Sequence, residues 1–386
     1  MNRVTAIIAT TVILLTGVVV VTLLVAQGYQ FDFHKRQLTP TGILVATSDP
    51  DGAAVYLNGE LKTATNNSLN LTPGRYLVKI AKDGFTPWQK DITIKSKEVF
   101  KTNAFLFPSL PDLSPVTLNG AADPTLSPDG TKIAYQVASA SAEKNGVWIL
   151  DMGRIFGPDF RQVSSQTYTS LAWDPDSKQL LASSSAATYL LDTNQNNLQP
   201  APLPAADTAS LLAQWQAAAA AKSAAMTAKL PKTIAAALAT SASTLRFSPD
   251  DSKILYQATA SARLPLVLTS YLPGTDPTPQ ARNLTATNVY VYDIKEDRNY
   301  EISNCKFQIS NCVWFPSSRH LLSYTDHEIA VTEYDGSNRA VIYAGPFVSP
   351  PAGGVFPWPN WSKIIILTSL NAPTGLGENL YSINLR

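Results

Sequence analysis

The sequence predicts an all-β protein with a single apolar helix at its N-terminus, and three observations lead to this prediction. A turn phrase, in which an aromatic residue or a serine precedes a proline and then a lysine or arginine, recurs between residues 127 and 365, each time before a β-rich run. The composition of 27 Pro, 15 Tyr and 7 Trp, with only 15% charged residues, suits strands joined by tight turns. An uncharged run covers residues 4–26. In chain order, we expect a transmembrane helix, a small β-sandwich and a five-bladed β-propeller with a helical insertion.

The uncharged run Val4–Ala26 is long enough as a helix to span about 35 Å and so to cross a bilayer. We therefore expect a cytoplasmic end at residues 1–3, a transmembrane helix at 4–26 and a tether at 27–41. A cleaved signal peptide ending at Leu24–Ala26 is the alternative, although the apolar region of a signal peptide is shorter, about 7–15 residues. The expected location is the cytoplasmic membrane, single-pass, with the N-terminus inside and the bulk of the chain extracytoplasmic.

Residues 42–100 alternate short β segments with turn pairs such as Asn58-Gly59 and Pro73-Gly74, which predicts a compact β domain. The segment resembles the PEGA domain, a small β domain of prokaryotic surface proteins. The motifs that carry this resemblance are Gly42–Val45, Pro50–Ala53, Val55–Gly59, Leu71–Tyr76 and Lys82–Phe85. Asp51 stands where the family name has Glu. The resemblance implies a surface adhesion or spacer module without catalytic residues, and a Pro-rich linker follows at 101–114.

Residues 115–386 carry the repeated turn phrase. Its proline recurs at Pro128, Pro175, Pro249, Pro316 and Pro359. The short spacings suit one four-stranded blade of about 40–50 residues, and the two long spacings require insertions. The last repeat lacks a strand, and we expect Pro115–Leu118 to complete it and so close a ring of five blades. The repeats resemble the propellers of TolB-like and WD-repeat-like periplasmic proteins, a fold that serves many functions.

The two insertions differ in kind. The first, at about 205–243, is Ala-rich and predicts helices, and the second, at about 265–287, is rich in Pro and predicts a loop. One helical face carries Leu211, Trp215, Ala219, Met226 and Leu230. We expect this face to pack on the propeller. A partner helix or a membrane surface remains the alternative.

The sequence offers no pattern typical of catalysis, so we predict that the protein is not an enzyme and that it has no catalytic, cofactor-binding or metal-binding residues. A Gly-x-Ser-x-Gly elbow, a phosphate loop and a Cys-x-x-Cys pair are absent. His320 and His327 lie in one repeat and are expected to be surface residues. The 30 basic and 29 acidic residues leave no net field that would attract nucleic acid.

Cys305 and Cys312 are the only cysteines, and they occur in a local duplication, Ile302–Cys305 and Ile309–Cys312. In an exported protein two such residues favour one disulfide. Two buried thiols on neighbouring strands are the alternative, and the sequence leaves both open.

The function expected from these features is that of an envelope-anchored binding or structural protein, non-catalytic, whose propeller head is displayed to an unknown envelope protein or cell-wall polymer. The alternative is a propeller that binds or cleaves glycans, and cleavage would need two carboxylates, or a His and a metal, in the central funnel. We expect four indoles to be core residues of inner strands, and their exposure on one face would favour glycan binding: Trp173, Trp314, Trp358 and Trp361.

Overall fold

The computed structural model describes residues 3–26, 29–32, 37–154, 157–270, 272–305, 309–350, 353–370 and 377–386. Its first element is the helix α1 (Arg3–Ala26). A transmembrane helix needs about 20 consecutive, predominantly apolar residues. Among the helices of the described residues, none combines the length and the apolar character that a membrane span requires. The predictions of a membrane-spanning helix and of a single-pass location in the cytoplasmic membrane are therefore wrong.

The chain divides into two compact units, which we describe separately. Unit 1 contains residues 1–106 and 269–279, and unit 2 contains residues 107–268 and 280–386. In unit 1, β1 (Tyr29–Asp32) and β2 (Gln37–Pro40) form an antiparallel pair within the segment expected to be a tether. Residues 27–28 and 33–36 of that segment lie outside the described residues.

Two sheets form the β domain of unit 1. The first sheet has the order β10-β3-β7 and the second the order β6-β5-β8-β9, and β4 pairs with β11. The strands of this domain are β3 (Gly42–Ala46), β4 (Ser48–Asp49), β5 (Ala54–Leu57), β6 (Glu60–Ala64), β7 (Asn67–Leu71), β8 (Gly74–Ala81), β9 (Trp88–Ile94), β10 (Val99–Lys101) and β11 (Ala104–Phe105). Alternate residues of β5 and β9 are buried, as expected for strands with one solvated face. Leu44, Val55, Ile80 and Ile92 join both sheets in one core.

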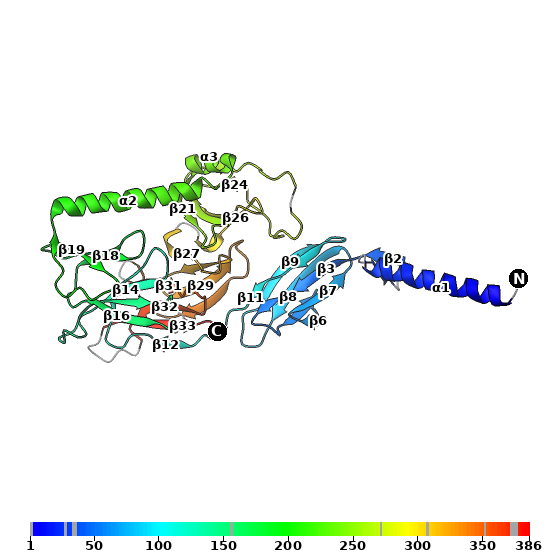
Figure 1. Cartoon of the computed structure of the whole chain (residues 1–386), viewed down its shortest axis with the longest axis horizontal. Helices are drawn as coiled ribbons and strands as arrows, with labels where there is room; N and C mark the ends of the chain where they lie inside the picture. Colours follow the sequence, from blue (N-terminus) through cyan, green and yellow to red (C-terminus); the bar gives the residue numbers. More distant parts are fainter. Residues whose placement is uncertain are drawn as a thin grey trace. The chain divides into compact units, whose positions relative to one another are not determined.

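Unit 2 contains five four-stranded antiparallel sheets (Figure 1). The first has β13 (Ala122–Leu126), β14 (Lys132–Val137), β15 (Gly146–Asp151) and β16 (Asp159–Ser164). The second has β17 (Ser170–Trp173), β18 (Gln179–Ser183), β19 (Thr188–Asp192) and β20 (Pro202–Leu203). The third has β21 (Ala242–Phe247), β22 (Lys253–Ala258), β25 (Val289–Asp293) and β26 (Arg298–Glu301). The fourth has β27 (Cys312–Trp314), β28 (His320–Tyr324), β29 (Glu328–Glu333) and β30 (Ala340–Ala344).

The fifth sheet joins the two ends of unit 2. Its strands are β31 (Val355–Pro357), β32 (Lys363–Thr368), β33 (Asn379–Asn384) and β12 (Leu113–Pro115). The prediction that the segment before the first repeat completes the last one is confirmed, although the pairing begins two residues earlier than expected, with Leu113 opposite Ile383. The amides of Val116 and Thr117 continue the pairing by donating to the Leu380 carbonyl, at 2.8 and 3.2 Å.

The remaining elements of unit 2 lie in its insertions and between its strands. These are α2 (Ala205–Thr227), α3 (Lys232–Ser241), β23 (Ala262–Arg263), β24 (Asn283–Leu284) and the 3-10 turns Ser303–Cys305 and Ile309–Asn311. Strands thus make up most of the regular secondary structure of the described residues, and the prediction of a β protein with few helices is confirmed.

Buried clusters join neighbouring sheets of unit 2. One cluster joins the fifth sheet to the first through residues such as Ile365 and Ile133. A second joins the first sheet to the second, with Ile149 beside Leu180, and a third joins the third sheet to the fourth. Each of the five sheets therefore shares a buried core with at least one other sheet.

Hydrogen bonds between backbone amides and aspartate side chains stabilise the repeated turns. In the first repeat, the Thr131 amide donates to the Asp129 carboxylate at 3.0 Å, as expected for an aspartate in a turn, whereas in the second repeat Asp174 rather than Asp176 accepts the turn amides. The third repeat matches the first, because the Ser252 amide donates to Asp250 at 3.0 Å. Desolvation by partial burial raises the pKa of Asp250, but hydrogen bonds from Ser252 and Ser248 outweigh it and lower this pKa to about 2.

Candidate functional site

The candidate site is a groove of about 580 Å³ between α2 and the sheets of unit 2. One face of α2 forms its first wall, through Leu212, Trp215, Gln216, Ala219, Lys222, Ser223 and Met226. These residues recur every three or four positions and so share one side of a helix. The second wall consists of Pro128, Ala172, Trp173, Pro175, Leu245 and Phe247, which come from the first three sheets and their turns. Figure 1 shows α2 running along the outer side of these sheets.

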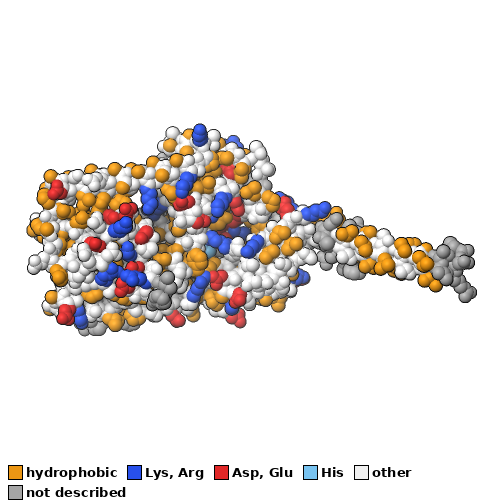
Figure 2. Space-filling model, in the orientation of Figure 1, with side chains coloured by type: hydrophobic (Ala, Val, Ile, Leu, Met, Phe, Trp, Pro, Cys, Tyr) orange, Lys and Arg blue, Asp and Glu red, His pale blue; other side chains and the backbone are white. Residues whose placement is uncertain are grey.

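The two helices of the insertion have different relations to the sheets. The helix α3 buries Ile234 and Leu238, which pack with Ile254 and Tyr256 of the third sheet. In contrast, no residue of α2 is buried. The face expected to pack on the propeller is therefore buried only at Leu230, whereas its other members on α2 are half-buried or, at Ala219, exposed. The helix α2 instead leaves apolar side chains beside the groove, and Figure 2 shows hydrophobic side chains exposed along it.

The sequence explains why only α3 reaches the core. Within α3, Ile234 and Leu238 are four residues apart, so their large side chains share one side of the helix and can fill a core, and Leu230, just before the helix, joins the same cluster. On α2 the large apolar residues are separated by alanines, whose side chains are too short to reach the sheet from the same distance. Leu211, which we expected on the packing face, is absent from the groove walls, and Leu212 occupies one instead.

The sheet wall is held in place by hydrogen bonds outside the groove. The Trp173 indole donates through Nε1 to the Thr125 carbonyl at 3.1 Å, which fixes the ring at the edge of the second sheet. Trp173 and Phe247 are half-buried, so each still presents part of its ring to the groove. Beyond α2, Lys229 forms an ion pair with Asp251 at 2.8 Å and so ties the end of the helix to the turn of the third sheet.

The polar groups of the groove lie on α2. Lys222 is the only ionisable residue in the two walls, and Trp215, Gln216 and Ser223 are its polar neighbours. In the described part of the chain, no hydrogen bond or ion pair involves the side chain of Lys222 or of Trp215. The groove therefore combines an apolar wall with hydrogen-bond donors that a ligand could use.

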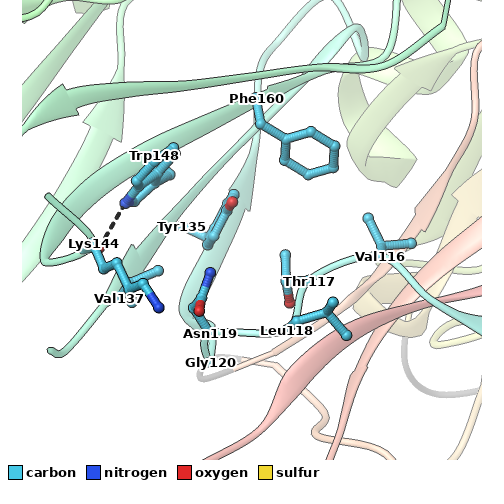
Figure 3. A pocket seen from close by; sticks show the side chains of 10 residues that line it. All are labelled: Val116, Thr117, Leu118, Asn119, Gly120, Tyr135, Val137, Lys144, Trp148 and Phe160. Atoms are coloured by element: carbon cyan, nitrogen blue, oxygen red, sulfur yellow. Dashed lines mark hydrogen bonds between the residues drawn. The ribbon is translucent and has the colours of Figure 1, made fainter.

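A second, smaller pocket of about 230 Å³ lies beside the start of the first sheet (Figure 3). The rings of Tyr135, Trp148 and Phe160 lie on one side of it, and the loop at 116–120 lies on the other. The Trp148 Nε1 donates to the Lys144 carbonyl at 2.9 Å. Burial raises the pKa of the Tyr135 hydroxyl, so this group stays neutral. This pocket is large enough for a single side chain only. The α2 groove is therefore the better candidate for the recognition of a partner.

The structure corrects the expectation for one histidine. His320 is only 3% exposed and its ring lies edge-on to Phe107 and Phe315, whereas His327 is exposed as expected. His320 begins β28 on a buried strand, and the repeat pattern alone did not show that Phe107 would cover it. Within the described ranges, no three His, Cys, Asp or Glu side chains converge as metal ligands.

The four indoles fall into two groups. Trp314 and Trp358 are buried, as predicted for core residues of inner strands. Trp361 is half-buried, and Trp173 is half-buried and lines the groove, a position that its place in the repeat did not indicate. The structure joins Cys305 and Cys312 in a disulfide, with 5.9 Å between their Cα atoms.

Comparison with known proteins identifies one part of the chain. Residues 41–109 match the PEGA domain family, which confirms the resemblance of the N-terminal β domain. No curated protein matches the chain. A solved structure of a TolB candidate from Agrobacterium tumefaciens is 14% identical, covering 66% of this chain and 76% of that chain, with a TM-score of 0.21. TolB from Acinetobacter baumannii is 12% identical, covering 81% of this chain and 60% of that chain, with a TM-score of 0.22.

Proposed function

We propose that this protein is a non-catalytic binding protein in which the five sheets of unit 2 form a closed five-bladed propeller, and that the groove beneath α2 is its docking site for a partner protein. The PEGA domain serves in this proposal as a spacer or adhesion module. The observation that carries the proposal is the contrast between the two helices of the insertion: α3 packs into the core, whereas α2 has no buried residue and faces a groove of about 580 Å³.

A ligand is expected in the groove because apolar surface that stays exposed to water is unfavourable. Each Å² of apolar surface removed from water contributes about 25 cal/mol. A helix of 23 residues with no buried residue gains little from its own domain, because most of the stability of a helix in a protein comes from tertiary packing of its apolar face. A ligand that fills the groove would bury both walls and hold α2 in place. Rigid scaffolds commonly bind partners on such insertions.

Glycan binding is the second candidate, because two indoles, Trp173 and Trp215, line the same groove. Aromatic faces can stack on the apolar face of a sugar. However, the wall opposite α2 consists of Pro, Ala, Trp, Leu and Phe side chains, which offer no polar partner for the hydroxyl groups of a sugar. The groove therefore fits an apolar protein segment better.

The experiment is site-directed photo-crosslinking through methionine. The chain has three methionines; Met152 is 3% exposed and Met226 lines the groove. The full chain would be produced with photo-methionine in the cells that naturally contain it, irradiated, and its cross-links mapped by mass spectrometry. We expect a protein cross-linked at residue 226, and loss of that product in Met226→Leu. An absence of any product at 226, or a product that persists unchanged in the variant, would overturn the proposed function.

A further inference from the structure

We propose that the α2 groove binds an extended peptide segment of about six residues, with apolar side chains facing the sheet wall and an acidic side chain beside Lys222. This inference rests on the proposed function and names the chemistry of its ligand. Three features of the groove carry it: its length, the nature of its sheet wall, and the spacing of the donors on α2.

The length comes from the helix. The groove face of α2 runs from Leu212 to Met226, and 14 residues at 1.5 Å per residue span about 21 Å. An extended chain advances about 3.3 Å per residue, so about six residues lie along this length. Successive side chains of an extended chain point to opposite sides. Every second side chain would therefore face the sheet wall, which Trp173, Leu245 and Phe247 make apolar.

The donors on α2 distinguish a peptide from other apolar ligands. The Trp215 indole N–H and the Lys222 ammonium donate hydrogen bonds and cannot accept them. These two residues are seven positions apart, about 10 Å along the helix. A ligand must then offer acceptors at two places about 10 Å apart. Backbone carbonyls occur at every residue of an extended peptide, whereas a fatty acid carries its acceptors at one end only.

The charge of the groove selects the acidic side chain. Lys222 is the only ionisable residue in the two walls, and the other nearby ammonium, that of Lys229, already pairs with Asp251. Lys222 is exposed, so a carboxylate that approaches it gains a charge-assisted hydrogen bond that solvent partly screens. A basic side chain at the same place would meet a like charge.

The experiment uses the full chain and a display library of hexapeptides that are randomised at all six positions. We expect selection to enrich apolar residues at alternate positions, together with one Asp or Glu. The selected sequence would then be made as a fluorescein-labelled peptide and its Kd measured by fluorescence anisotropy. Thermal melts would establish that each variant described below is folded.

Matched variants on α2 test the place of binding. Ala219 lies in the groove wall, and Ala221, two positions along, is exposed and lies about 200° further round the helix. Ala219→Gln fills the groove and is expected to weaken binding at least 30-fold, whereas Ala221→Gln makes the same change outside it and should stay within twofold. Lys222→Glu should weaken binding of the acidic peptide at least tenfold and favour a peptide in which Lys replaces the acidic residue.

Each other outcome counts against the proposal. Selection without a consensus, or a consensus peptide that binds Ala219→Gln as well as the original chain, overturns it. Equal binding of acidic and basic peptides to the Lys222→Glu variant removes the charge argument and so overturns it as well. If dodecanoate binds in a manner that Ala219→Gln blocks while no peptide binds, the groove takes an amphiphile. In that case a protein cross-linked at residue 226 would still support the proposed function. The absence of this cross-link would overturn both the proposed function and the peptide proposal.

Discussion

One buried hydroxyl group, that of Thr117, helps to hold the start of unit 2 against β33. This hydroxyl accepts a hydrogen bond from the Leu380 amide at 2.9 Å and donates to Asn379 Oδ1 at 3.1 Å. Leu380 is fully buried and Thr117 is 7% exposed, so water cannot replace the lost partner readily. Thr117→Val keeps the shape of the side chain and removes both bonds. A buried donor left without a partner costs about 1–3 kcal/mol.

We therefore expect Thr117→Val to lower the free energy of unfolding of unit 2 by about 2 kcal/mol. For a domain of this size, 1 kcal/mol shifts Tm by about 2–4 °C, so Tm should fall by about 4–8 °C. Six of the seven tryptophans, all except Trp88, belong to unit 2, so tryptophan fluorescence during thermal and denaturant unfolding reports mainly on this unit.

Thr117→Ser is the matched control, because it keeps the hydroxyl and loses one methyl group, worth about 0.8 kcal/mol. The valine variant should be clearly less stable than the serine variant, and the Leu380 amide should exchange its hydrogen faster in the valine variant only. If the free energy of unfolding of Thr117→Val lies within about 0.5 kcal/mol of that of the original chain, the reasoning that these bonds hold the start of unit 2 against β33 is refuted.

Four further predictions follow from other parts of the structure. The pKa of Asp250 is lowered from 3.8 to about 2, so the ionised side chain stabilises the folded state above about pH 4, and this contribution is lost as the pH falls towards 2. Because the residue is exposed, we expect the contribution to be less than about 1 kcal/mol. It would be measured by comparing the acid unfolding of the original chain with that of Asp250→Asn. In unit 1, Lys90 and Asp276 form an ion pair at 2.9 Å, and their side chains are 9% and 8% exposed. Lys90→Met leaves the Asp276 carboxylate buried without this partner and should destabilise unit 1 by about 3 kcal/mol. An unchanged midpoint of urea unfolding would contradict this argument. Cys305 and Cys312 are seven positions apart, and reduction of their disulfide should lower the free energy of unfolding by about 2.5 kcal/mol. Calorimetry with and without reductant measures this difference. Equal stability under both conditions would show that the disulfide contributes nothing. The purified chain should turn over no peptide, ester or glycan substrate, and hydrolysis that disappears with a single carboxylate substitution would show that it is an enzyme.

Much of the architecture could be predicted from local sequence patterns. The recurrent proline, aspartate and lysine mark turns, because Pro sets φ and an Asp side chain bonds the backbone two residues on, as Asp129 and Asp250 do. The unpaired strand at the end of the last repeat implied a partner before the first, and the structure provides it in β12. The PEGA motifs marked the N-terminal β domain, which the family comparison confirms. Such features are local or periodic, so one chain suffices to show them.

The candidate site could be predicted only in part. The sequence placed Trp215, Ala219 and Met226 on one helical face, but it did not show whether that face would be buried. It also placed Trp173 in an inner strand without indicating that its ring would face α2. No signal in a single sequence pairs these residues, because the groove depends on how far α2 lies from the sheet.

The sequence by itself determined the repeats, the turns and the closing strand of this protein, since each depends on backbone preferences and on the alternation of apolar residues. The tertiary structure decided what those patterns could not: that α3 enters the core while α2 does not, and that His320 is buried against Phe107. These outcomes depend on distances between residues far apart in the chain. Packing sets those distances, and periodicity carries no information about them.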